Sequence, residues 1–306
     1  MDVPPPRVSV LMLTHNHAEF LQQAIDSVRA QTLQDWELLI GEDASSDITA
    51  TIAHQAAVAD LRISVFTSPE GALGFHQNFS RLLAAAQAPY VAFLEGDDWW
   101  SDPCKLERQV ALLEQDASLA FCGGRTRVLD QRTNSGPHSA SIGPLAGRER
   151  LAMADLISSY NFHFSSVLMR RHAVELPRWI FSQYCLDRPL YLLAARHGDA
   201  GIIPFELSVY RLHGGGVWAP LSPVEKARRS QQLFTEFKCH FRDQSPLLSR
   251  TLSRILWSYL ADALDSHQRQ SAAVIFLTAV QAAPVMRLVR ELPLTLAVVR
   301  RLLLSI

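Results

Sequence analysis

The sequence predicts an α/β fold with a mostly parallel sheet flanked by helices, followed by a helical C-terminal extension. Over the first 130 residues, short apolar runs suited to buried strands alternate with segments of helical periodicity. From Pro223 onward the periodicity is helical. We therefore expect one domain over residues 1–222 and a helical region over residues 223–306.

The expected elements follow one another in strand–helix order. The run VSVLML, residues 8–13, is apolar at nearly every position, as in a strand buried on both faces. Asn16, with Glu19 three residues later, predicts a capping box for the helix that follows. Further strands are expected over 36–40, 63–67, 90–94, 119–130, 164–170 and 202–210. Further helices are expected over 47–60, 75–86, 103–115, 148–158 and 187–197, with a long surface loop over 133–147.

Three of the expected strands end in polar or acidic residues. Thr14-His15-Asn16 follows the first strand, Glu42-Asp43 ends the second, and Asp97-Asp98 follows the fourth. In open α/β sheets, ligands bind beyond the carboxyl ends of the strands. The sequence therefore predicts a binding site at this edge of the sheet.

The adjacent carboxylates of Asp97 and Asp98 are the strongest chemical signal. Two neighbouring carboxylates repel each other unless a cation neutralises them, and carboxylate oxygens suit Mg²⁺ or Mn²⁺. We expect Asp98 to be an exposed carboxylate at a strand end. The alternative for the pair is a solvated turn that caps the next helix.

Composition excludes several other classes of protein. With 29 basic and 30 acidic residues the net charge is -1, so no basic field is available to hold nucleic acid. The four cysteines form no CxxC pair, which disfavours a zinc site or a dense disulfide framework and fits a reducing cytoplasm. No run of about 18 apolar residues predicts a membrane span. Dinucleotide and P-loop motifs are absent.

Several blocks of the sequence, in order, resemble the family 2 glycosyltransferases of the GT-A fold. The blocks are VSVLMLTHN, AIDSVRAQTLQDWELLIGEDASSD, YVAFLEGDDWWSDPCKLERQ, SSVLMRR, CLDRPLYLLAARHG and SVYRLHGGGVW. The resemblance implies a nucleotide-sugar half over residues 1–130 and an acceptor half over 131–222. It also implies a nucleotide-sugar donor, with a UDP-sugar favoured, a divalent metal (Mn²⁺ or Mg²⁺), and inversion at the anomeric carbon.

The resemblance also assigns roles to single residues. Asp187 matches the catalytic base, although its position before Arg188-Pro189 also suits a helix cap. The expected nucleotide-sugar contacts are Thr14 and Asn16 at the first strand, Asp43 at the base, and Asp97 at the ribose or a metal-bound water. The expected metal ligands are Asp98 and His213, the latter beside three glycines.

Three other side chains have two interpretations each. Trp99 and Trp100 either stack on a sugar ring or pack in the core. Lys105 is expected to be a solvated helix lysine, with pairing to the diphosphate as the alternative.

The expected activity is transfer of one sugar to a hydroxyl of a glycan or lipid-linked glycan, in cell-surface polysaccharide or lipopolysaccharide synthesis. The QxxRW element of processive synthases is absent. A catalytically inactive glycan-binding or scaffold module and a nucleotidyltransferase are the alternatives. The basic, leucine-rich segment 284–306 predicts peripheral contact with the inner face of the cell membrane, and packing on the catalytic domain or against a second subunit is the alternative.

Overall fold

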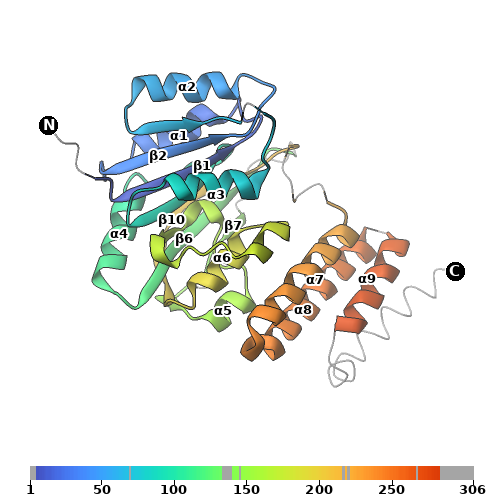
Figure 1. Cartoon of the computed structure of the whole chain (residues 1–306). Coiled ribbons are helices and arrows are strands. Elements are labelled where there is room, and N and C mark those ends of the chain that lie inside the picture. Colours follow the sequence, from blue (N-terminus) through green and yellow to red (C-terminus); the bar gives the residue numbers. More distant parts are fainter. Residues whose placement is uncertain are drawn as a thin grey trace. The chain divides into compact units, whose positions relative to one another are not determined.

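The computed structural model describes residues 5–68, 70–132, 140–144, 146–215, 218, 221–266 and 268–282 (Figure 1). The chain divides into two compact units. The first comprises Met1–Leu156, Tyr160–Phe181 and Cys185–His213, and the second comprises Ile157–Ser159, Ser182–Tyr184 and Gly214–Ile306. The expected division at residue 222 stays a prediction.

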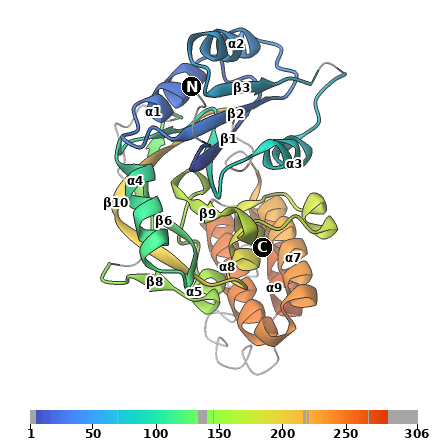
Figure 2. The ribbon, with the colours of Figure 1, turned by 60° about the vertical axis from the view of Figure 1, so that its left-hand side comes forward.

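The first unit is built on one ten-stranded sheet (Figure 2). Its strands are β1 (Val8–Thr14), β2 (Trp36–Glu42), β3 (Ile63–Phe66), β4 (Tyr90–Glu95), β5 (Trp99–Trp100), β6 (Leu119–Asp130), β7 (Ala140–Ile142), β8 (Arg150–Leu151), β9 (Leu168–Arg170) and β10 (Asp199–Leu212). The main order is β3-β2-β1-β4-β9-β6-β10-β5. The strands β3, β2, β1 and β4 are mutually parallel, as expected. Beyond β4 the sheet is mixed, because β9 runs antiparallel to both of its neighbours, β4 and β6.

Helices cover both faces of this sheet. Those of the first unit are α1 (Leu21–Arg29), α2 (Thr49–Ala59), α3 (Phe75–Ala85), α4 (Lys105–Gln115), α5 (Met153–Ser158, of which Ile157 and Ser158 fall in the second unit) and α6 (Asp187–Ala194). Every residue of β1 is buried, and Val8, Val10 and Met12 share one core with buried residues of α1, α2 and α4. On the other face, Phe93 of β4 stacks on Phe164 at 4.3 Å between ring centroids. The predicted fold class, an α/β sheet with a helical C-terminal extension, is confirmed.

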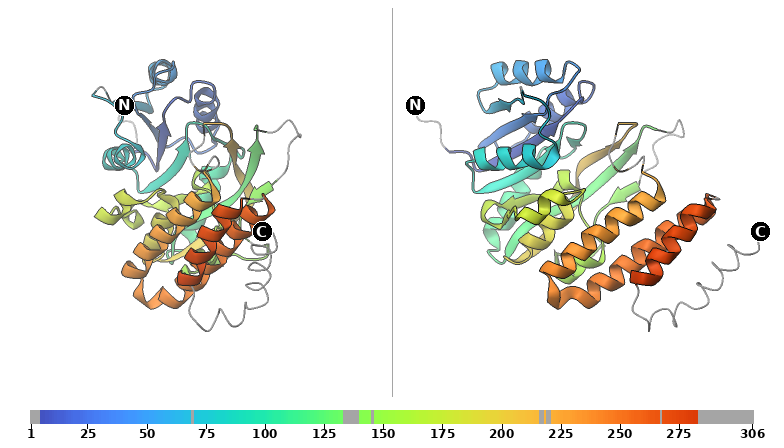
Figure 3. Two further views of the ribbon diagram at one scale, coloured as in Figure 1. Left: turned by 90° about the vertical axis from the view of Figure 1, so that its right-hand side faces the viewer. Right: turned by 45° about the vertical axis from the view of Figure 1, so that its right-hand side comes forward.

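The second unit is helical over its described residues beyond Ser222. It contains α7 (Pro223–His240), α8 (Ser245–Asp265) and α9 (Arg269–Ala282), which lie side by side (Figure 3, orange to red). The α7 helix begins where the sequence predicts, because the Ser222 hydroxyl accepts the backbone N–H of Glu225 at 3.2 Å and Pro223 occupies the first turn. In α8, Leu248, Leu252, Leu256 and Leu260 form the buried stripe.

None of the helices in the described part of the chain is both long and apolar enough to cross a bilayer. The segment 284–306, for which we expect membrane contact, lies outside the described residues.

Lys105 is fully buried, so both interpretations offered by the sequence are wrong. It opens α4 on the face that packs against the sheet. Its Nζ donates to Gln109 Oε1 at 2.7 Å and lies 4.1 Å from the centroid of the Trp100 ring. Burial lowers the pKa of the Lys105 ammonium to about 7, against smaller opposing effects of Cys122 and Asp102.

Lys105 therefore makes stability depend on pH. Its pKa is about 7 in the native state and about 10.4 in an unfolded chain. Between these values the unfolded state binds more protons, so the free energy of unfolding rises with pH. We expect the wild type to gain about 2 kcal/mol between pH 7 and pH 9 relative to Lys105→Met. Urea unfolding across this range measures the difference, with Lys238→Met as the control; equal pH dependence in Lys105→Met and wild type would contradict the assignment.

Candidate functional site

The carboxyl ends of β1, β2 and β4 meet at one edge of the sheet. Thr14 pairs with Glu42, and Leu13 pairs with Glu95. Beyond the strands, the Asp43 N–H donates to Thr14 O at 3.1 Å. The polar residues that follow these three strands are therefore neighbours, as the sequence predicts.

Asp97 is held by two histidines. Its Oδ2 lies 3.0 Å from His213 Nε2 and 3.7 Å from His17 Nε2. Burial acts to raise the pKa of Asp97, but the His213 hydrogen bond and the nearby His17 outweigh it, so the pKa lies below its usual value. His213 thus contacts Asp97 through this hydrogen bond, and its role as a metal ligand stays a prediction.

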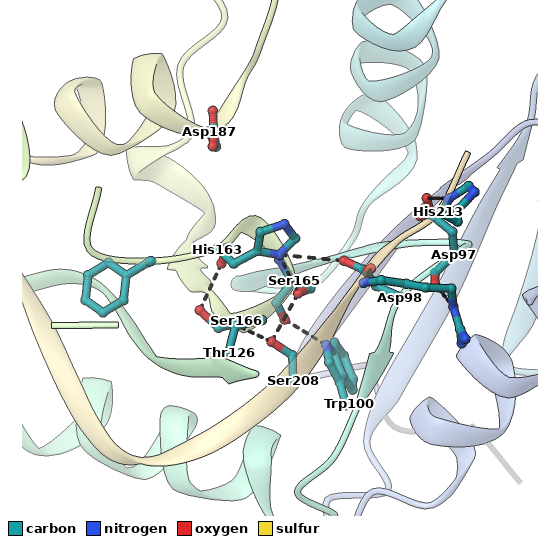
Figure 4. Close-up of polar contacts among 12 residues, drawn as sticks. Asp97, Asp98, Trp100, Thr126, His163, Ser165, Ser166, Asp187, Ser208 and His213 are labelled. Atoms are coloured by element: carbon teal, nitrogen blue, oxygen red, sulfur yellow. Dashed lines mark hydrogen bonds and ion pairs between the residues drawn. The ribbon is translucent and has the colours of Figure 1, made fainter. Parts of the chain in front are cut away.

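Asp98 is buried rather than exposed, with 1% of its surface accessible, so the sequence-based expectation is wrong. The cause is the long strand β10, whose Arg211 donates its backbone N–H to Asp98 Oδ1 at 2.9 Å. Asp98 Oδ2 points toward His163, whose Nδ1 is 3.6 Å away (Figure 4). This oxygen is buried, and no described residue forms a hydrogen bond with it.

Glu95, Asp98 and His163 form a cluster that fits a divalent cation. Each offers one ligand atom, and these atoms lie within 4.8 Å of one another. Burial, together with the charges of Asp97 and Glu95, raises the pKa of Asp98 well above its usual value. Burial, with Asp97 and Asp187, raises the pKa of Glu95 to about 8. A bound cation would relieve this repulsion and give the unpartnered oxygen of Asp98 a ligand.

Asp187 opens α6, close enough to the acidic cluster to raise the pKa of Glu95. Its Oδ1 accepts the backbone N–H of the adjacent Arg188 at 2.8 Å, which is not a capping bond, because the N-cap position of α6 is Leu186 and has no side-chain cap. Its Oδ2 accepts the Tyr160 hydroxyl at 2.6 Å, and the Tyr160 side chain is partly exposed. The carboxylate is therefore oriented from two sides.

Thr14 and Asn16 occupy the loop after β1 in different ways. Thr14 is 2% exposed, and its hydroxyl has no hydrogen-bond partner within the part of the chain that the structure describes. It lies against Gly96, where any Cβ would come within 2.7 Å of Thr14 Oγ1. Asn16 does not form the predicted capping box, because α1 begins only at Leu21 without a side-chain cap. Instead Asn16 adopts φ 54° and its Oδ1 accepts the Ser46 N–H at 2.8 Å, which ties the loop after β1 to the loop after β2.

Asp43 holds the loop that leads into α3. Its Oδ1 accepts the Leu73 N–H at 2.7 Å and the Ser68 hydroxyl at 3.2 Å, and its Oδ2 accepts the Gly74 N–H at 2.8 Å. A carboxylate has about four acceptor positions. The described part of the chain uses three of them, which leaves one position of Asp43 for a further donor.

The two tryptophans after Asp98 lie in different environments. Trp100 is buried and donates its indole N–H to Ser165 O at 2.8 Å, so it packs in the core. Trp99 is partly exposed, and the Arg211 guanidinium carbon lies 4.6 Å from its ring centroid. Of the two, only Trp99 keeps an accessible face.

His163 and His17 were not predicted from the sequence as site residues, and no ligand role was predicted for Glu95. Glu95 has a local signal, since it stands two residues before Asp97 at the end of an apolar strand. His163 has none: it follows Asp98 by 65 residues and reaches it only because β9 enters the sheet next to β4.

Comparison with known proteins agrees with this architecture. The uncharacterized protein Rv1520 of Mycobacterium tuberculosis is 29% identical over 214 residues, which cover 69% of this chain and 60% of that protein. The uncharacterized glycosyltransferase EpsJ of Bacillus subtilis is 28% identical over 200 residues, covering 63% of this chain and 57% of EpsJ. The chain thus spans less than two thirds of the length of these relatives.

Solved structures share the fold. S. aureus TarS 1-349 in complex with UDP-GlcNAc matches with a TM-score of 0.66 at 15% identity, over 91% of this chain and 82% of that one. The mannosyltransferase PcManGT of Pyrobaculum calidifontis, in complex with GDP-Man and Mn2+, matches with a TM-score of 0.60 at 18% identity, over 98% and 87%. The family model described as "Glycosyl transferase family 2" matches residues 9–176, more than half of the sequence, and the chain therefore belongs to that family.

Proposed function

We propose that the chain transfers one sugar from a nucleoside-diphosphate sugar to an acceptor hydroxyl, with inversion at the anomeric carbon. The observation that carries the proposal is the acidic cluster at the carboxyl edge of the sheet, in which the buried Asp98 Oδ2 has no hydrogen-bond partner among the described residues. Such a cluster suits a divalent cation together with the diphosphate that the cation binds. Asp187 lies close to this cluster and supplies a carboxylate for the acceptor.

Asp98 and Glu95 would supply oxygen ligands to Mn²⁺ or Mg²⁺, and His163 of the same cluster would supply a nitrogen. His213, expected from the sequence as a ligand, is proposed as the alternative nitrogen ligand. The bound metal would offset the negative charge that develops on the departing nucleoside diphosphate. Asp97 is proposed to contact the ribose or a metal-bound water, held in place by its hydrogen bond with His213.

Asp187 is proposed as the general base. The acceptor oxygen bonds to the anomeric carbon as the bond from that carbon to the diphosphate oxygen breaks, and the hydroxyl proton passes to Asp187. Attack from the face opposite the leaving group inverts the configuration. The Tyr160 and Arg188 hydrogen bonds orient the carboxylate for this step.

The donor and acceptor are proposed from the relatives' names. Solved structures with this fold bind UDP-GlcNAc or GDP-Man, which supports a nucleotide-sugar donor, with a UDP-sugar favoured. TuaG of B. subtilis, which is 34% identical over 119 residues, carries the name of a putative teichuronic acid biosynthesis glycosyltransferase. We therefore propose a cell-surface glycan, or its lipid-linked precursor, as the acceptor, glycosylated on the cytoplasmic side of the membrane.

Thermal unfolding in the presence of nucleotides tests the proposal. A ligand that binds only the native state stabilises it, by about 2.7 kcal/mol at one hundred times its Kd. We expect UDP or GDP with Mn²⁺ to raise the melting temperature by several degrees, and the same nucleotide with EDTA to raise it much less. If no nucleoside diphosphate shifts the melting temperature with Mn²⁺ present, the proposed function is wrong.

Asp43→Ala is expected to weaken nucleotide binding and to leave the metal site in place. Its remaining acceptor position is proposed to bind the nucleotide base, and a hydrogen bond to a charged group contributes roughly 10- to 100-fold in affinity. Isothermal titration with UDP and with Mn²⁺ measures the two effects separately. Ser68→Ala is the control, since it removes a single contact to Asp43; unchanged UDP affinity in Asp43→Ala would exclude the base contact.

We also propose peripheral membrane contact through residues 284–306, on the sequence alone. Four arginines and one glutamate give this segment a side-chain charge of 4 - 1 = +3, among many leucines and valines. We expect the full chain to pellet with anionic liposomes and a chain ending at residue 283 to stay in the supernatant. Equal pelleting of both chains, or of neither, would remove the membrane role.

A further inference from the structure

A polar hollow of about 400 Å³ lies in the second unit. It is lined by residues 182–184, which precede α6, and by residues of α7 between Glu225 and Gln232. Both segments belong to this one unit, and the Gln232 side-chain amide joins them by donating to Ser182 O at 3.4 Å. The lining contains none of the residues proposed to bind the donor or the metal or to act as the base.

The described lining carries two positive charges and one negative charge. Glu225, Arg228 and Arg229 stand three and four positions apart on α7, so their side chains share one face of the helix. Arg229 Nε donates to Glu225 Oε1 at 2.9 Å. Arg228 lies 3.9 Å from the other oxygen of Glu225, and 80% of its side chain is exposed. Glu225 thus offsets one guanidinium, and the surplus positive charge favours an anion.

An aromatic ring forms another part of the lining. Tyr184 is partly exposed, and its ring stacks on Trp218 with 4.9 Å between centroids and 18° between planes. This stacking holds the Tyr184 ring in place. Aromatic rings pack against the C–H faces of sugar rings, while polar side chains of the same pocket bind the sugar hydroxyls. The lining therefore suits a ligand that combines a sugar ring with a negative charge.

The chain itself keeps Tyr184 near the proposed base. Two residues, Cys185 and Leu186, separate Tyr184 from Asp187. The Cα atoms of Tyr184 and Asp187 are therefore at most about 11 Å apart. In the proposed reaction the acceptor hydroxyl lies at Asp187, so the part of a glycan next to that hydroxyl comes within reach of the hollow.

We propose that the hollow binds an acidic sugar residue of the acceptor glycan, with Arg228 at its carboxylate and Tyr184 against its ring. The inference rests on the proposed function, because it requires Asp187 to act on the acceptor. It narrows the acceptor to glycans that contain a uronic acid. A neutral sugar would leave the surplus charge of the hollow unpaired, and a simple anion would not use the Tyr184 ring.

Saturation-transfer NMR tests this with glucuronic and galacturonic acid, each titrated beside its neutral counterpart, glucose or galactose. We expect one uronic acid to bind the wild type, and its neutral counterpart to bind roughly 10-fold more weakly, the effect of a hydrogen bond to a charged group. Arg228→Gln should weaken the uronic acid by the same factor and leave the neutral sugar unchanged, whereas Tyr184→Leu should weaken both. Arg242→Gln, an exposed arginine of the same unit outside the hollow, is the control. All variants should bind UDP with Mn²⁺ as the wild type does.

Several results would overturn the inference. If neither uronic acid binds, or if Arg228→Gln leaves its binding unchanged, the hollow does not recognise an acidic sugar. If inorganic phosphate displaces the uronic acid with equal affinity, the hollow recognises charge alone. If Arg228→Gln weakens UDP as well, the hollow belongs to the donor site. If the wild type binds the uronic acid but no nucleotide, the proposed function fails, and the hollow is a carbohydrate site without an acceptor role.

Discussion

Asp187→Asn is expected to lower the rate of sugar transfer by roughly 10²- to 10⁴-fold, the usual contribution of a general base. The amide cannot take the proton of the acceptor hydroxyl. Its shape is nearly that of the carboxylate, and its oxygen can still accept the Arg188 N–H, so the start of α6 should be preserved. Binding of the nucleotide sugar should stay within twofold of wild type, because Asp187 acts on the acceptor.

The measurement is release of the nucleoside diphosphate under saturating donor, alongside calorimetry for donor binding. Asp155→Asn is the matched control. Asp155 lies in the first turn of α5, where its Oδ2 accepts the Ala152 N–H at 3.0 Å, and it has no role in the proposed reaction. If Asp187→Asn turns over at the wild-type rate, Asp187 is not the general base.

Asp98→Ala is expected to abolish metal-dependent donor binding, weakening it by roughly 100-fold or more. Even partners of metal ligands contribute 10- to 100-fold in metal affinity, and Asp98 is proposed to be a ligand itself. The fold should tolerate the change. The substitution leaves the Arg211 N–H without its acceptor but removes a buried carboxylate that repels Asp97 and Glu95.

Three readouts separate metal loss from unfolding. Electron paramagnetic resonance counts bound Mn²⁺, calorimetry gives UDP affinity with and without Mn²⁺, and thermal melting reports the fold. Asp116→Ala is the control, because Asp116 pairs with Arg150 at 2.5 Å, outside the site. A folded Asp98→Ala variant that binds Mn²⁺ and UDP as the wild type does would show that the metal lies elsewhere.

The part of the site that could be predicted is the part set by local sequence. An apolar run followed by an acid places a carboxylate at a strand end, and parallel strands bring such ends to one edge of the sheet. Thr14, Asp43 and Asp97 were placed correctly for this reason. The burial of Asp98 depends on Arg211, which follows it by 113 residues. No local sequence pattern predicts that contact.

Tertiary contacts also overrode two local patterns. Asn16 and Glu19 have the spacing of a capping box, but the side chain of Asn16 is used by Ser46 in a neighbouring loop. Lys105 lies near the start of a helix where charged residues are usually solvated, yet Gln109 and Trp100 enclose it. In both cases the deciding partner belongs to the three-dimensional packing rather than to the helix itself.

The insertion of β9 between β4 and β6 has a consequence for synthesis on the ribosome. The parallel strands β1 to β4 are complete once Glu95 has emerged, but the outer edge of β4 has no partner until Leu168 to Arg170 follow. At roughly 5–20 residues per second this takes about 4 to 15 seconds. During that time the nascent chain carries an apolar strand edge of the kind that pairs with other chains. Chains truncated before Leu168 should therefore be the form of this protein most prone to aggregate.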